Sequence, residues 1–221
     1  TIWAVREGET KVIVKDVITN QATFTRVIVT DGVTYPQLVL GKDTTTALKK
    51  NGTVWAWGDN AFRTEEGVIR TDDTSVNKGE MYGKLGFGSV QELITTPVQL
   101  QDYIEVTGLA EGYGMADWEK NKKPFRNILQ VVAGDNHMLA LDDKGKVYAW
   151  GDNSYGQLGF PLKTVGTGGT VVTNGLRYSR YPVLVSTIPE DVKIVTIAAG
   201  ANHSLALDTK GHVWAWGNNS S

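Results

Sequence analysis

The chain has 221 residues, with 22 lysines and arginines, 24 aspartates and glutamates, and no cysteine. A formal net charge of -2 without a long run of one sign argues against nucleic acid as a partner, and the missing thiols exclude disulfides and thiolate metal sites. No apolar run approaches the roughly 18 residues that a membrane-spanning helix requires, so we expect no membrane insertion.

Short apolar strands separated by glycine turns follow one another along the chain, and no long segment has the spacing of an amphipathic helix. The first strand is predicted at residues 2–4, and a hairpin around the turn KKNG at residues 41–58. The same hairpin returns around DDKG at residues 134–151 and around DTKG at residues 200–217. In each, the turn glycine supplies the positive φ that such hairpins require.

These hairpins align without a gap as copies of one repeat. Further along the repeat, YGKLG at Tyr82 matches YGQLG at Tyr155, and the proline-led strand PVQL matches PVLV. With insertions set aside, the unit has four strands in about 50 residues, which predicts all-β, four-stranded antiparallel blades of a β-propeller. The predicted units are residues 1–53, 54–146 and 147–212 with a partial strand at 213–221, and the insertions are residues 61–81, 101–127 and 160–180.

The segment from Gly134 to Gly159 resembles the repeat of the regulator of chromosome condensation family. It has that repeat's glycine, His-x-x-Ala-Leu, Gly-x-Val-aromatic-x-Trp-Gly, Asn and Gly-x-Leu-Gly in order. The resemblance covers residues 36–60, 82–100 and 128–221 and implies part of a seven-bladed propeller. We therefore expect a fragment of a longer propeller, completed by the remaining blades or by further copies of the chain.

Residues that recur in every copy are interpreted as structural. His137 and His203 lack metal-site spacing, so we expect them to hydrogen-bond backbone inside a blade. Pairs such as Asp152-Asn153 are interpreted as turn formers, and the tryptophans as packing between blades. The predicted structural positions are Gly41, Trp57, Gly58, Gly134, His137, Trp150, Gly151, Gly200, His203, Trp216 and Gly217. We expect no catalytic residue, no cofactor and no metal.

Function is expected in the insertions, because the repeat does not need them. Residues 170–181 (TVVTNGLRYSRY) are predicted to form a hairpin with Asn174-Gly175 as its turn. The aromatic and arginine side chains of two insertions are of the types enriched in interface anchors. The candidate partner-binding residues are Tyr113, Trp118, Phe125, Arg126, Arg177, Tyr178 and Arg180.

The first functional hypothesis is a non-catalytic interaction or scaffold module that presents these loops to a protein. The resemblance implies mainly protein-interaction roles, and a cysteine-free sequence with long insertions is similar to bacterial members that are parts of secreted or surface proteins. One alternative is a polysaccharide-acting or carbohydrate-binding propeller, although acid pairs such as Asp142-Asp143 fall in turns or insertions. Another is a guanine-nucleotide exchange factor, a role implied by the resemblance whose partner-contacting insertion matches no residue here. A third reading is a structural tiling element.

Overall fold

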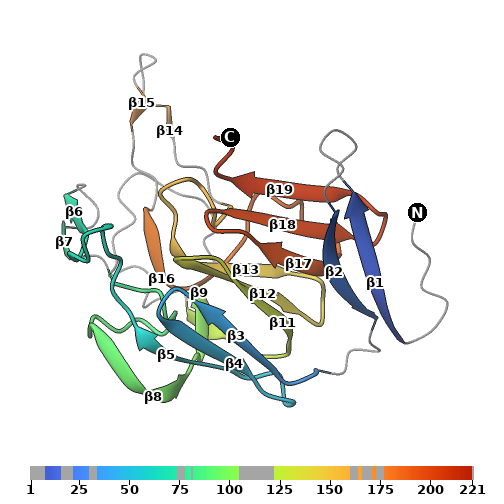
Figure 1. Cartoon of the computed structure of the whole chain (residues 1–221), viewed down its shortest axis with the longest axis horizontal. Coiled ribbons are helices and arrows are strands. Elements are labelled where there is room, and N and C mark those ends of the chain that lie inside the picture. Colours follow the sequence, from blue (N-terminus) through green and yellow to red (C-terminus); the bar gives the residue numbers. More distant parts are fainter. Residues whose placement is uncertain are drawn as a thin grey trace.

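The computed structural model describes residues 8–15, 22–29, 34–73, 78–80, 82–104, 122–159, 164–165, 171–172 and 177–220. The elements of these residues are all β-strands (Figure 1). In the same part of the chain, no helix is long and apolar enough to cross a membrane. In chain order the strands are β1 (Gly8–Lys15), β2 (Ala22–Val29), β3 (Gln37–Gly41), β4 (Thr44–Leu48), β5 (Val54–Asp59), β6 (Thr71–Asp73), β7 (Lys78–Glu80), β8 (Leu93–Gln99), β9 (Asp102–Ile104), β10 (Lys122–Pro124), β11 (Ile128–Ala133), β12 (His137–Asp142), β13 (Val147–Asp152), β14 (Thr164–Val165), β15 (Val171–Val172), β16 (Tyr178–Leu184), β17 (Ile194–Ala199), β18 (His203–Asp208) and β19 (Val213–Gly217).

Three successive sheets repeat one antiparallel strand order. We call them blade 1 (β3-β4-β5-β8), blade 2 (β11-β12-β13-β16) and blade 3 (β17-β18-β19). In the view of Figure 1 blade 1 lies at the bottom, blade 2 in the middle and blade 3 above it. Each blade combines two strands from one sequence repeat with the following strands from the next, so the sheets are offset from the predicted units. The fold is a segment of a β-propeller, as the sequence predicts.

Blade 2 departs from the four-stranded pattern at its outer edge. β9 pairs in parallel with β16 through Val183 and Ile104, and β10 continues the sheet beyond β9. The hairpin predicted for residues 170–181 is wrong, because β15 pairs with β14 while β16 pairs with β13. β16 is thus the fourth strand of the repeat, and it begins at Tyr178 opposite Asp152.

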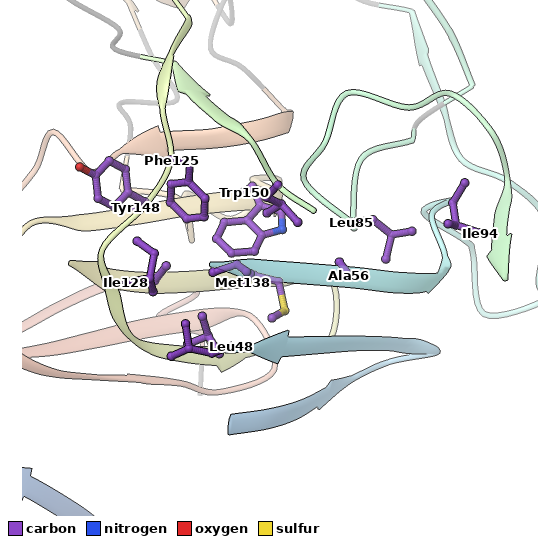
Figure 2. Close-up of a cluster of buried hydrophobic side chains, with 13 residues drawn as sticks. Leu48, Ala56, Leu85, Ile94, Phe125, Ile128, Met138, Tyr148 and Trp150 are labelled. Atoms are coloured by element: carbon purple, nitrogen blue, oxygen red, sulfur yellow. The ribbon is translucent and has the colours of Figure 1, made fainter. Parts of the chain in front are cut away.

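The hydrophobic core lies between the blades. One cluster joins Leu48, Val54 and Ala56 of blade 1 to the Tyr148 and Trp150 face of blade 2. Figure 2 shows Trp150 in this cluster with Phe125 on one side and Leu85 on the other.

A second cluster joins Leu139, Leu141 and Val147 of blade 2 to Ile197 and Ala206 of blade 3. Because both faces of blade 2 are covered, every residue of β12 and β13 is buried, whereas burial alternates along β4 of blade 1 and β18 of blade 3. Trp150 is fully buried in the first cluster, between blades 1 and 2.

Candidate functional site

His137 connects blade 2 to blade 3. Its Nε2 lies 2.9 Å from the hydroxyl of Ser204, and that hydroxyl donates to the carbonyl of Gln157 at 2.8 Å. Because the single hydroxyl hydrogen goes to Gln157, Nε2 donates to Ser204. Burial lowers the pKa of His137 to about 4, although the charge of Asp152 acts in the opposite direction. The expectation of a backbone partner in the same blade is corrected: the partner is a side chain of the next blade.

The repeat glycine that precedes His137, His203 or Thr44 leaves room for the side chain of that residue. A Cβ on Gly134 would lie 2.3 Å from Cε1 of His137, and one on Gly200 would lie 2.2 Å from Cε1 of His203. In blade 1 a Cβ on Gly41 would lie 2.5 Å from the hydroxyl of Thr44. These three glycines are therefore packing positions.

A carboxylate closes the hairpin turn of blade 2. Oδ1 of Asp142 accepts the amides of Lys144 at 2.9 Å and Lys146 at 2.8 Å, while Oδ2 accepts the hydroxyl of Tyr148 at 3.1 Å. Burial raises the pKa of Tyr148, and the neighbouring charge of Asp142 adds to the rise. Asp142, considered above as half of a catalytic pair, is thus occupied by its own turn.

In blade 3 an aspartate closes the hairpin turn in the same way, whereas blade 1 has a lysine at the equivalent position. Asp208 accepts the amide of His212 at 2.9 Å and the indole N–H of Trp214 at 3.2 Å. Burial acts to raise the pKa of Asp208, but these hydrogen bonds outweigh it and hold the pKa well below its usual value. In blade 1 the ammonium of Lys49 instead stacks 3.7 Å from the ring centre of Trp55.

Two buried asparagines hold the Gly-x-Leu-Gly loops. Oδ1 of Asn153 accepts the amide of Leu158 at 2.9 Å, and Oδ1 of Asn60 accepts the amide of Leu85 at 3.2 Å. The second bond spans the insertion of residues 61–81, which therefore leaves the repeat contact intact. The turn-former interpretation is confirmed for Asp152, whose Oδ1 accepts the amide of Ser154 at 3.2 Å.

Two glutamines link the first strands of successive blades. Oε1 of Gln37 accepts the amide of Val131 at 3.0 Å, and Oε1 of Gln130 accepts the amide of Ile197 at 3.0 Å. Neither glutamine is among the sequence-predicted site residues. Both stand four positions before a repeat glycine, and that shared offset is the signal that identifies them. Thr196 occupies this position in blade 3.

The insertion after β5 is fixed to blade 2 at its base. Phe62 is fully buried, and its ring centre lies 5.7 Å from that of Tyr178. Arg70 forms an ion pair with Asp152 at 3.0 Å and donates to the hydroxyl of Ser154 at 2.6 Å. The start of this insertion therefore fastens one blade to the next.

Beyond this base, exposed apolar residues stand next in sequence to two residues that Arg63 contacts. The guanidinium donates to the carbonyl of Gly67 at 3.0 Å and to the carboxylate of Glu92. Val68 next to Gly67 is 64% exposed, and Leu93 next to Glu92 is 62% exposed. Val90 is a further exposed apolar residue before β8. We call Val68, Val90 and Leu93 the insertion surface.

The structure describes five of the seven candidate partner-binding residues and separates them into three groups. Phe125 is 2% exposed and Tyr178 is 3% exposed, so the expectation that they anchor a partner at the surface is wrong: both pack between blades. Arg126 and Arg177 are exposed, and their partner binding stays a prediction. Arg180 is half-buried and donates to the hydroxyl of Tyr178 at 3.2 Å. Tyr113 and Trp118 lie outside the described residues.

Among the residues that the structure describes, no group of three or more His, Cys, Asp or Glu side chains could hold a metal ion.

Comparisons with known proteins find curated relatives that are much longer than this chain. Protein pim1 of Schizosaccharomyces pombe is 29% identical over 196 residues, which are 82% of this chain and 34% of the relative. Protein RCC1 of Candida albicans is 28% identical over 197 residues, 82% of this chain and 40% of the relative. The human E3 ubiquitin-protein ligase HERC2 is 33% identical over 173 residues, 78% of this chain and 2% of the relative. The chain thus spans less than half the length of these three eukaryotic proteins.

Similar solved structures include yeast RCC1 (Prp20) bound to Kap60 and human WBSCR16. The first is 23% identical with a TM-score of 0.38, covering 83% of this chain and 42% of that one. The second is 19% identical with a TM-score of 0.37, covering 93% of this chain and 54% of that one.

Two family profiles match the sequence, and both are described as the regulator of chromosome condensation (RCC1) repeat. One matches residues 144–207, and the other matches residues 37–63, 128–157 and 194–221. Together they cover more than half of the chain and include the hairpins of all three blades. The chain belongs to the RCC1 repeat family.

Proposed function

We propose that this chain is a non-catalytic protein-interaction module and that its insertion surface binds a protein partner. The observation that carries the proposal is the exposure of three apolar side chains in the segments that Arg63 joins: Val68, Val90 and Leu93 are 64%, 57% and 62% exposed. Exposed apolar residues that gather on a folded protein commonly mark a site where another protein binds.

The contacts beneath this surface support the proposal. Arg70 with Asp152, and Phe62 with Tyr178, hold the base of the insertion against blade 2. Arg63 pairs with Asp59 at 2.8 Å and with Glu92, which joins the insertion to the segment before β8. A surface that is already ordered loses less conformational entropy when a partner binds.

The proposal that the chain is non-catalytic rests on the contacts of the residues that a catalytic or carbohydrate-binding site would use. Asp142 uses both carboxylate oxygens within its own turn. Tyr148 and Trp150 are 7% and 0% exposed, which makes them packing residues rather than a carbohydrate platform. Measurable turnover of a glycan by this chain would contradict this part.

The class of partner follows from the charge and the family. A net charge of -2 without a basic run disfavours nucleic acid, so we propose a protein. A bacterial origin, within a larger secreted or surface protein, stays a prediction based on the cysteine-free sequence and its insertions.

Site-specific photo-crosslinking tests the proposal. A photoreactive amino acid replaces Val68 in one variant and Leu93 in another, and each is irradiated in an extract of the source cells. We expect the same protein to be captured from both positions. Lys144 is exposed in the hairpin turn before β13, at the other end of that strand from Asp152, which pairs with Arg70 of the insertion. It is the matched control and should not capture this protein. Equal capture from Lys144, or none from Val68 and Leu93, would reject the insertion surface as the binding site.

A further inference from the structure

The hairpin turn of blade 1 contains the tripeptide Asn51-Gly52-Thr53, which has the form of an acceptor site for N-linked glycans. Such a site needs an asparagine, then any residue except proline, and then a serine or threonine. The same pattern begins at Asn202 and at Asn218. A fourth begins at Asn219, but it ends at Ser221, which lies outside the described residues. Exposure and hydrogen bonding distinguish the first three sites from one another.

Asn51 is exposed, and Thr53 holds one branch of its side-chain amide. The hydroxyl of Thr53 donates to Oδ1 of Asn51 at 2.7 Å, and the backbone amide of Thr53 donates to the same oxygen at 3.3 Å. Because a backbone amide can only donate, it identifies the branch that faces Thr53 as the oxygen. The other branch is Nδ2, the nitrogen to which a glycan is joined.

A third side chain orients the hydroxyl of Thr53. The indole N–H of Trp55 donates to this hydroxyl oxygen at 3.1 Å. Since Trp55 is the donor in that bond, the single hydroxyl hydrogen is left for Oδ1 of Asn51. The two residues that an acceptor site requires are therefore already hydrogen-bonded to each other in the folded turn.

The other two hairpin turns use the equivalent amide differently. In blade 2, Asp142 accepts the amide of Lys146, which holds the repeat position of Thr53, and an aspartate of blade 3 makes the same bond. Blade 1 has Lys49 at the position of Asp142, and an ammonium group cannot accept a hydrogen bond. The amide of Thr53 is therefore left to Asn51.

The exposure of Asn51 does not depend on how many blades lie beside it. Lys144 holds the same repeat position in blade 2, which packs against a blade on each side, and Lys144 is exposed as well. Lys210, at this position in blade 3, is also exposed. The repeat thus presents this position to solvent in the middle of the stack and at its ends alike.

The sites at Asn202 and Asn218 are less accessible. Asn202 is half-buried, and the Ser204 of its site is 0% exposed and donates its hydroxyl hydrogen to a backbone carbonyl. Ser220 donates to Oδ1 of Asn218 at 2.6 Å, but Asn218 is half-buried. Asn218 also holds the repeat position of the two buried asparagines that bind the Gly-x-Leu-Gly loops. Among these three sites, Asn51 is the exposed acceptor.

We propose that Asn51 carries an N-linked glycan. In the transfer, Nδ2 of Asn51 forms a bond to the anomeric carbon of a sugar chain held on a lipid pyrophosphate. The bond between that carbon and the pyrophosphate oxygen breaks, the lipid pyrophosphate leaves, and one proton of the amide nitrogen is released. The reaction is a group transfer without a change of oxidation state.

The site lies apart from the insertion surface. Asn51 precedes β5, whereas Asp59, which pairs with Arg63, ends that strand. Because a strand of six residues is roughly 20 Å long, the glycan is joined at the far end of β5 from the insertion. The inference therefore does not depend on the insertion surface, although it requires a compartment that supplies the donor, as the predicted secreted or surface protein would enter.

Synthesis of the chain behind a signal peptide, in the presence of microsomal membranes, tests the proposal, because these membranes supply the transferase and its lipid-linked donor. We expect a product of lower mobility in a denaturing gel, which peptide-N-glycosidase returns to the mobility of the unmodified chain. This glycosidase converts the modified asparagine to aspartate, so digestion in heavy-oxygen water should label the position of Asn51 in a mass spectrum. The protein isolated from its source cells should give the same label.

Substitutions identify the site. N51Q and T53A should each lose the product of lower mobility, whereas T53S keeps a hydroxyl and should retain it. N202Q and N218Q are the matched controls and should both retain it. An unmodified Asn51 in the membrane assay or in the source cells overturns the proposal, and so does a label at Asn202 or Asn218 without one at Asn51. Unmodified Asn51 together with photo-crosslinking from Val68 would leave the proposed function standing while this inference falls.

Discussion

Single residues of this protein take their properties from the blade beside them. His137 and His203 hold the same repeat position, yet His137 is 1% exposed and His203 is exposed to solvent. Blade 3 covers His137 and supplies Ser204 as its partner. Repetition in the sequence thus predicts where a side chain stands in its blade, while the neighbouring blade determines its chemistry.

The buried histidine predicts a pH dependence of stability. Burial lowers the pKa of His137 from 6.5 to about 4, so the folded chain binds fewer protons than the unfolded chain between these values. The contribution is fully present above pH 6.5 and is lost as the pH falls toward 4, by up to roughly 3 kcal/mol. Urea unfolding at a series of pH values should show this slope, and H137Q should flatten it. H203Q is the matched control; an unchanged slope in H137Q would assign the effect to other groups.

Gly134 and Gly200 hold the same repeat position but have different surroundings. Adding a methyl group to each tests whether the surroundings or the repeat position determine the loss of stability. In G134A the new Cβ would lie 2.3 Å from the buried His137 ring and 2.5 Å from the carbonyl of Gly200, and neither neighbour is free to move. We expect a loss of about 1–3 kcal/mol in the free energy of unfolding. In G200A the close atoms all belong to the exposed ring of His203, which can turn away, so the loss should be smaller. Equal losses in thermal unfolding would contradict this difference.

At the scale of elements, the glutamines of β3 and β11 each act on the strand that begins the next blade. Q130A removes the acceptor of the Ile197 amide, and Q37A removes that of the Val131 amide. An amide left without a partner at such an interface costs about 1–3 kcal/mol. Hydrogen exchange should therefore accelerate at Ile197 in Q130A and at Val131 in Q37A, so each variant serves as the control for the other. Acceleration of both amides in both variants would indicate general destabilisation instead.

The strands follow from the sequence, because each blade repeats the same apolar residues and turn glycines. The hairpins around Gly52, Gly145 and Gly211 form where the pattern places them, each with a positive φ. The insertions were less predictable because their contacts join distant parts of the chain. Tyr178 is buried by Phe62, and Phe125 lies 6.0 Å from Trp150 between ring centres. No local pattern distinguishes an aromatic residue packed in this way from one exposed to a partner.

The whole molecule is a stack in which burial depends on how many neighbours a blade has. Blade 2 has a blade on each side, and its central strands are buried throughout. Blades 1 and 3 each have one blade-covered face among the described residues, and Leu38 and Val213 remain exposed on the other. In stacks of this kind, stability is approximately a sum of the repeats and the interfaces between neighbours. The same substitution should therefore have different effects in different blades.

One substitution at three equivalent positions measures this dependence directly. V54A and V147A each remove two methyl groups from side chains that are 0% and 3% exposed, and we expect losses of about 1–3 kcal/mol in the free energy of unfolding. V213A removes the same groups from a side chain that is 69% exposed and should change stability in dilute solution by less than about 0.5 kcal/mol. Urea unfolding of the three variants at one low concentration makes the comparison. A loss in V213A as large as that in V54A would contradict the dependence on neighbouring blades, because it would mean that the face around Val213 is already covered within a single chain.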